Sequence, residues 1–369
     1  MRPHLTLFLG IFAVMALSNA IVPVLPLYGE NSSAQGMIYS AYFLGAFLVT
    51  LPAGILSDRF GRIPFIRLGL ALTVTSGLFL AVTSGGPWVV PAARFFEGIG
   101  AGLFVAAAMS LVNSDPDHIR LSGFLMAFLN AGLVAGLLLA GWLAVFLQVP
   151  ASGILLFSFL AMVPAFCGFF IHEPARSSAS IRCSTVFGFI SRYRWLWYSS
   201  IVLIGITGVI ISLYPKLSGA SSDVLGLWIA GMSIATIAAV LIYSRTTVHP
   251  VTAIRWSALL IAASVILAFW SAAGILLIGA LAGVVMIAQM AFLATLQKHQ
   301  GIIMGLFSMT SYLGMAILPF AAGFAADFLG FFGAFCLTAL CSVTVAVSIS
   351  RCPCDTGNGA GSAGNAEEQ

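Results

Sequence analysis

Long apolar segments separated by short polar gaps dominate this chain of 369 residues. A segment of about 20 apolar residues is long enough to cross the hydrocarbon core of a bilayer as a helix. In lipid, each segment must satisfy its own backbone polar groups, so each segment of this kind predicts a transmembrane helix. Twelve segments fit this pattern: Leu5–Tyr28, Gln35–Ser57, Ile63–Ser84, Trp88–Val112, Leu121–Leu147, Ser152–Ile171, Trp195–Tyr214, Asp223–Tyr243, Trp256–Ala272, Gly274–Leu296, Ile302–Ala325 and Phe328–Ser350.

The first apolar segment could be taken for a signal peptide, because Arg2 precedes it. It is longer than the apolar region of roughly 7–15 residues in secretory signals, and no small-residue cleavage site follows it. We therefore expect a retained first helix, which Pro23 and Pro26 interrupt.

Composition excludes a soluble globular domain. Apolar residues make up 60% of the chain and charged residues 7%, against about 25% charged residues in soluble domains. If the N-terminus is cytoplasmic, thirteen of the fifteen Lys and Arg residues fall in cytoplasmic loops, leaving Lys216 outside and Arg94 within the fourth segment. This asymmetry follows the positive-inside rule, and it predicts a plasma-membrane protein with both termini in the cytoplasm.

The longest polar gap divides the segments into two sets of six. The halves also share glycines at similar spacings, such as Gly45 with Gly231 and Gly132 with Gly314. These repeats predict an all-α integral membrane protein of twelve transmembrane helices in two pseudo-symmetric six-helix bundles, as in alternating-access transporters. The expected parts are an N-terminal bundle, a cytoplasmic central loop, a C-terminal bundle and a disordered tail, over residues 1–171, 172–194, 195–351 and 352–369.

Motifs for catalysis or cofactor binding are missing from the sequence. There is no Walker loop, no paired His/Glu metal motif and no nucleophile elbow. We expect no enzyme activity, no cofactor, no metal and no nucleic-acid partner. The six cysteines show no disulfide framework. Cys352-Pro-Cys354 is either half of a metal site or a pair of tail thiols, and no second Cys/His pair lies nearby.

The gap after the second segment, "GILSDRFGRIP", holds an unusual density of charge. Gly61 permits a tight reversal between two antiparallel helices, and Gly54 lets a neighbouring helix approach closely. Arg59 and Arg62 are expected as cytoplasmic anchors. Asp58, at a helix end, requires a cationic partner or the N-terminus of another helix.

This stretch resembles the loop signature of the major facilitator superfamily, Gly-x-Leu-small-Asp-basic-x-Gly-basic-basic. Ile63 departs from it, where the family usually has a basic residue. The resemblance implies that Asp58 faces the start of the eleventh helix, near Gly301–Ile302, and bridges the two halves. A second interpretation stays open, in which the charges of this loop only set the orientation of the chain in the membrane. The matching residues are Gly54, Leu56, Ser57, Asp58, Arg59, Gly61 and Arg62.

The fourth segment contains both an acid and a base, in "RFFEGIGAG" at residues 94–102. Their spacing of three places Arg94 and Glu97 on one helical face, and ionisable residues at that depth usually have a function. The stretch is similar to the superfamily's fourth-helix pattern Arg-x-x-Gln-Gly-x-Gly, with Glu97 in place of Gln. The alternative is a structural ion pair. The related positions in the second half are Ile275 and Ile278.

The fifth segment departs from the superfamily's antiporter signature, Gly-Pro-x-x-Gly-Gly. Leu137 replaces its Pro and Ala140 replaces a Gly, which weakens an inference of antiport. Five glycines are expected at helix contacts in the fourth and fifth segments: Gly98, Gly100, Gly132, Gly136 and Gly141.

Isolated polar side chains within the segments complete the candidate translocation and coupling site. Each of them is more typical of a helix–helix hydrogen bond than of a ligand contact. Asn19 has the strongest claim, because the prolines after it can free backbone carbonyls for a substrate. The candidates besides Arg94 and Glu97 are Asn19, Tyr39, Tyr42, Asn130 and Gln289.

Three functions are compatible with these patterns. The first is a secondary active transporter of the drug or metabolite efflux branch, in which protons drive export of an amphipathic compound and Glu97 carries the proton. The second is a uniporter or importer of a sugar or organic anion, with Arg94 as the counter-ion. The third is a membrane sensor or scaffold that does not transport. The expected partners are a small-molecule substrate, protons and the lipid bilayer, and nothing requires more than a monomer.

Overall fold

The computed structural model describes residues 3–83, 86–115, 117–169, 190–246, 249–294 and 300–351, except for the side chains at positions 3, 58, 119, 300–302 and 304. Most of the chain described is helical, as a backbone in lipid requires. The elements are α1 (Pro3–Ala20), η1 (Val22–Val24), α2 (Leu25–Tyr28), α3 (Ser32–Phe60), α4 (Ile63–Val82), α5 (Val89–Asn113), α6 (His118–Phe146), α7 (Ser152–Gly168), α9 (Arg194–Ser218), α10 (Ser222–Tyr243), α11 (Pro250–Trp270), α12 (Ala273–Ala294), α13 (Gln300–Ser348) and η2 (Ile349–Arg351).

The predicted spans are present among the described residues. Ten helical segments are long and apolar enough to cross a membrane. One of them, α13, is interrupted at Gly330, where φ is 74° and ψ is 167°, so it contains two spans. The apolar helix α7 has 17 residues, the lower limit of the usual range for a transmembrane helix. Counting α7 and both parts of α13 gives the twelve expected helices.

Two interruptions of the spans have local causes. The first helix stops at Ala20 and continues as η1 and α2, with Pro23 and Pro26 in their first turns. Proline lacks an N–H and is tolerated there, so the predicted interruption is confirmed.

The gap predicted at Asp327 is wrong, because the break between the last two spans lies at Gly330. Glycine adopts a positive φ without a Cβ clash, whereas Asp327 remains helical.

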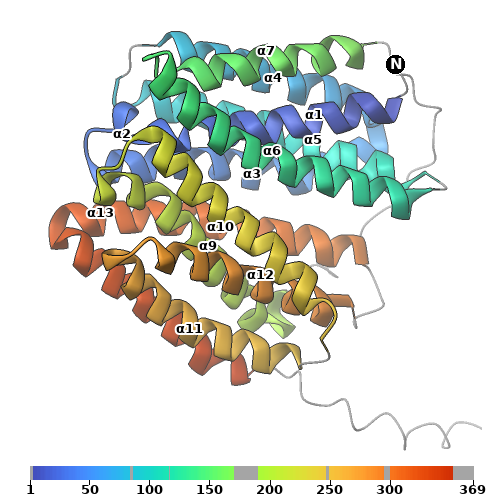
Figure 1. Cartoon of the computed structure of the whole chain (residues 1–369). Coiled ribbons are helices and arrows are strands. Elements are labelled where there is room, and N and C mark those ends of the chain that lie inside the picture. Colours follow the sequence, from blue (N-terminus) through green and yellow to red (C-terminus); the bar gives the residue numbers. More distant parts are fainter. Residues whose placement is uncertain are drawn as a thin grey trace, which may run out of the picture.

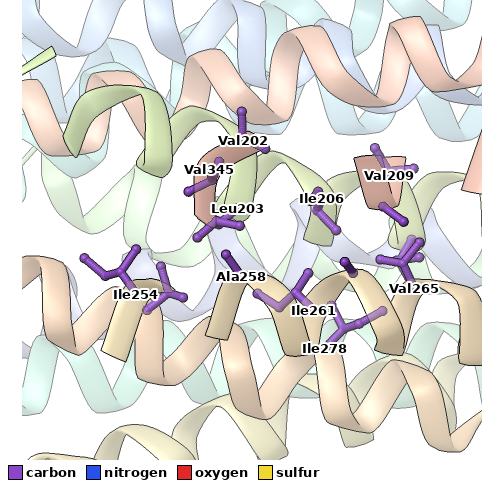
Figure 2. Packing of buried hydrophobic residues seen from close by; sticks show 14 of the residues in the cluster. Val202, Leu203, Ile206, Val209, Ile254, Ala258, Ile261, Val265, Ile278 and Val345 are labelled. Atoms are coloured by element: carbon purple, nitrogen blue, oxygen red, sulfur yellow. The ribbon is translucent and has the colours of Figure 1, made fainter. Parts of the chain in front are cut away.

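Each half of the chain has an apolar core of its own. The largest cluster of buried apolar side chains lies within residues 193–349. Figure 2 shows α9, α11, α12 and α13 meeting in this core, with Leu203 and Ile206 from α9 and Ala258 and Ile261 from α11. Another cluster lies within residues 7–125. The predicted loop residues 172–189 and the tail 352–369 fall outside the described residues.

The two halves meet where α3 contacts α13 and where α6 contacts α10 (Figure 1). One apolar cluster contains side chains of both halves, which we call the inter-half cluster. It includes Leu137 and Ala140 of α6 and Ile229 and Ala230 of α10, each at most 1% exposed. The inter-half cluster lies toward the end of the molecule where α1 stops and α3 starts. We call this end the Asp327 end, and the two halves are packed together there.

The opposite end, which we call the basic end, is where most of the arginines gather. The positive-inside rule predicts that this end faces the cytoplasm. The arginines at this end include Arg59, Arg62, Arg67, Arg120, Arg194, Arg245, Arg255 and Arg351.

Candidate functional site

A buried ion pair lies in the first half of α5. Arg94 Nη1 donates a hydrogen bond of 2.7 Å to Glu97 Oε2, and both side chains are 1% exposed. The spacing of three residues predicted this pairing on one helical face. Removing two charges from water costs several kcal/mol per ion before their attraction is counted. A pair buried to this degree therefore requires further partners.

Two neighbouring helices supply partners for Arg94. Its Nη2 donates to the carbonyl oxygen of Ser18 at 3.1 Å, and its Cζ lies 4.5 Å from the centre of the Tyr42 ring. Ser18 is in the last turn of α1, where carbonyls lack partners within the helix. The Tyr42 contact has the geometry of a cation–π interaction. Arg94 thus connects α5 to both α1 and α3.

The pair is incompletely satisfied. Arg94 Nε and Glu97 Oε1 have no hydrogen-bond partner among the described residues, although both atoms are buried. Buried polar atoms are usually hydrogen-bonded, and an exception requires an explanation. A carboxylate with a free oxygen can accept a proton, and a guanidinium with a free N–H can donate to a ligand. The geometry therefore provides one site for each of these events.

Aromatic rings extend from the ion pair to the second half of the chain. The Tyr42 ring lies 5.1 Å from that of Phe43, which is 5.0 Å from Tyr39 and 6.2 Å from Tyr312 on α13. Aromatic pairs at these separations attract one another. The candidate set from the sequence lacked Phe43, because no local pattern distinguishes it from other aromatic residues in the spans.

The other predicted candidates have separate partners. Asn19 Nδ2 donates to the Leu133 carbonyl at 3.3 Å, which connects α1 to α6. Asn130 bonds back within its own helix at 2.8 Å, and Gln289 Nε2 donates to Ser199 Oγ at 2.9 Å. None of the three is hydrogen-bonded to Arg94 or Glu97 in the part of the chain that the structure describes. Of the seven candidates, the structure brings Arg94, Glu97, Tyr42 and Tyr39 together.

The candidate glycines lie where backbones of neighbouring helices approach closely. A Cβ at Gly98 would meet the Tyr42 carbonyl, and one at Gly100 would meet Gly69 and Thr73. These contacts set the distance between α5 and its neighbours α3 and α4. Gly132 and Gly136 face the backbone of α1 at Phe12 and Ala16, and Gly141 faces Ser222 of α10.

We expect Gly98→Ala to destabilise the protein, because the new methyl group would meet backbone atoms of Tyr42 that cannot rotate away. Overpacking of this kind costs about 1–3 kcal/mol. The melting temperature of the purified protein in one detergent measures the effect. The matched control is Gly123→Ala on α6, where a Cβ would meet no described atom within 4 Å. Equal melting temperatures for the two variants would contradict the assigned contact.

The charged loop lies at the basic end, between α3 and α4. Gly61 has a φ of 90°, which favours glycine. Arg62 Nη1 donates to Ser114 Oγ at 2.7 Å, and Arg59 lies over the Phe60 ring. The close approach predicted at Gly54 is wrong, because a Cβ there would meet no described atom within 4 Å. Asp58 is the last-turn acid of α3, but the side chains that would test its contact with residues 301 and 302 lie outside the described residues.

The second half has no counterpart of the ion pair at the related positions. Ile275 and Ile278 of α12 are fully buried apolar side chains. Among the described residues, no group of three or more His, Cys, Asp or Glu side chains could hold a metal ion. The charge within the described spans is therefore strongly asymmetric between the halves.

Comparison with known proteins agrees with this architecture. The family model for the Major Facilitator Superfamily matches residues 7–294. The quinolone resistance protein NorA of Staphylococcus aureus (strain MRSA252) is 27% identical over 187 residues, which are 47% of this chain and 46% of NorA. The chain thus matches about half the length of this curated relative.

Solved structures share the fold at low identity. A bacterial homologue of the human lysosomal transporter Spinster, in an inward-facing and occupied conformation, aligns with a TM-score of 0.78 at 14% identity, over 95% of this chain and 96% of that one. The human organic anion transporter MFSD10 (TETRAN) aligns with a TM-score of 0.67 at 18% identity, over 94% of this chain and 99% of that one. The helical architecture and the family match together show that this chain belongs to the Major Facilitator Superfamily, a family of membrane transporters.

Proposed function

We propose that this chain is a proton-coupled secondary transporter that exports a small amphipathic compound by alternating access. The observation that carries this proposal is the buried Arg94–Glu97 pair, with its unpaired Glu97 oxygen and its contacts to α1 and α3. Buried ionisable residues in membrane spans are expensive and commonly form proton relays. We place the protein in the plasma membrane as a monomer, with both termini and the basic end in the cytoplasm.

Protonation of Glu97 would change what holds three helices together. With Glu97 ionised, Arg94 has a counter-ion in α5 and adds the Ser18 carbonyl and the Tyr42 ring as partners. A proton on Oε1 neutralises the carboxylate and leaves a buried cation without a counter-ion. Such a cation is costly, so the protonated state favours a conformation in which Arg94 reaches water or a substrate. The carboxylate thereby links proton binding to helix rearrangement.

The aromatic rings beside the pair indicate the substrate class. The Tyr42 ring lies against Arg94 of the pair, and the rings of Phe43, Tyr39 and Tyr312 continue from it across both halves. Aromatic faces attract organic cations as well as apolar groups. The similarity to a protein named for quinolone resistance supports efflux as the direction of transport.

Transport by purified protein in liposomes tests this function. A pH gradient is imposed, and lipophilic cations, sugars, amino acids and organic anions are supplied one at a time with a radiolabel. We expect a lipophilic cation to accumulate only while the gradient exists, and a protonophore to abolish its accumulation. Flux that follows only the gradient of the compound itself would contradict proton coupling and would favour a uniporter.

A second function, transport of an organic anion, is favoured by the unpaired Nε of Arg94 and by the fold shared with an organic anion transporter. In that case Arg94 binds the anion, and its planar guanidinium group can donate two hydrogen bonds to it at once. Lysine cannot reproduce bidentate contacts, so Arg94→Lys is expected to weaken anion affinity about tenfold or more, measured as the concentration for half-maximal uptake. Unaltered affinity in this variant would exclude Arg94 as the anion site.

A further inference from the structure

Asp327 joins the two halves at the end opposite the charged loop. Its Oδ1 accepts a hydrogen bond of 3.0 Å from the backbone N–H of Ser32, and its Oδ2 accepts one of 2.9 Å from that of Ser33. Ser32 and Ser33 are the first residues of α3, in the other half of the chain. One carboxylate therefore binds two successive amides that lie almost 300 positions away in the sequence.

These bonds replace the ordinary cap of α3. The first N–H groups of a helix lack partners within it, and their partial positive charge favours an anion. The N-cap residue, Asn31, is of a type that usually binds them, but its side chain makes no capping hydrogen bond here. The anion is supplied by α13 instead, and charge-assisted bonds of this kind are stronger than neutral ones.

Close backbone packing surrounds the contact. A Cβ at Gly323 on α13 would meet Ser32 and Ser33, and one at Gly36 on α3 would meet the carbonyl of Pro319. Nearby, Lys216 Nζ donates to the carbonyl of Glu30 at 2.6 Å. The carboxylate is exposed, and it thus lies at the edge of a tightly packed crossing of α3 and α13, beside the inter-half cluster.

We propose that Asp327 is a latch that stabilises the conformation closed at the Asp327 end, and that opening exchanges it for Asn31 as the cap of α3. Opening separates α3 from α13, so both amides lose the carboxylate. The Asn31 side chain can then accept from the first turn of α3, which lowers the cost of opening. This inference rests on the proposed alternating access, but its test needs no substrate.

The test measures how readily the closed end opens. Ala230, which is 1% exposed in the inter-half cluster, is replaced by Cys in a chain whose six native cysteines are replaced by Ser. A membrane-impermeant maleimide is then added from the Asp327 side of proteoliposomes, and the labelling rate is recorded. Asp327→Asn removes the charge and one acceptor, so we expect the rate to rise about tenfold.

Two further variants keep the result interpretable. Asp223→Asn is the matched control, since Asp223 begins α10 at the same end but its carboxylate is hydrogen-bonded within its own half, to Ser221 and to the backbone of Val224; its rate should be unchanged. Asn31→Ala should instead slow labelling, about fivefold, because it removes a cap used only in the open state. A slower rate cannot arise from unfolding.

An unchanged rate in Asp327→Asn, or an equal rise in Asp223→Asn, would overturn the latch. If labelling is unchanged while accumulation still depends on the pH gradient, the latch alone is wrong. If the labelling results hold but no proton coupling is found, the latch stands and the proposed function fails.

Discussion

Replacing Arg94 by leucine is expected to destabilise the protein by about 3–5 kcal/mol, because it leaves Glu97 as an uncompensated charge in the interior. The carboxylate is fully buried, and Arg94 is the partner of its one hydrogen-bonded oxygen. The same substitution also removes the hydrogen bond to Ser18 and the contact with Tyr42. The melting temperature of the purified protein in detergent measures the loss.

The double variant Arg94→Leu/Glu97→Leu separates a lost charge partner from lost packing. Replacing both members of a buried ion pair by apolar side chains is often neutral or stabilising. We therefore expect the double variant to recover most of the melting temperature lost by the single one. If the double variant is as unstable as the single one, the ion pair is not what stabilises this part of the protein.

The second large effect is expected from Glu97→Gln, which we predict removes proton coupling and, like protonation of Glu97, leaves Arg94 without a counter-ion. Glutamine has nearly the same shape and can still accept a hydrogen bond from Arg94 at the position of Oε2. It cannot bind or release a proton. A compound that wild type accumulates against its gradient should therefore only equilibrate in this variant, so the accumulation ratio falls to about one.

The control for this substitution makes the same chemical change elsewhere. Glu30→Gln alters an exposed glutamate at the Asp327 end, and it should leave accumulation unchanged. Exchange of labelled for unlabelled compound, which needs no proton, should continue in Glu97→Gln. Accumulation by Glu97→Gln at the wild-type level would contradict the role assigned to this carboxylate.

Much of the fold could be predicted because lipid imposes simple rules. Apolar segments of sufficient length predicted the helices, and Pro23 and Pro26 predicted the interruption of the first one. The spacing of Arg94 and Glu97 predicted that they share a helical face. These are local properties, and each depends on residues within one segment.

The contacts that complete the site could not be predicted, because they join distant segments. Nothing near Ser18 indicates that its carbonyl accepts from Arg94, and nothing near Phe43 indicates that it lies between Tyr42 and Tyr312. The sequence predicts a gap between two spans at Asp327, because polar residues often mark gaps. The structure instead uses its carboxylate to cap α3.

Proton movement in proteoliposomes tests the central claim most directly. Wild type and Glu97→Gln are reconstituted with a pH-sensitive dye inside, and a compound that wild type accumulates is added outside. Proton-coupled transport through Glu97 predicts a change of internal pH on addition of the compound in wild type, and no change in Glu97→Gln. An equal pH change in both would show that Glu97 does not carry the proton, and none in either would show that transport is not coupled to protons.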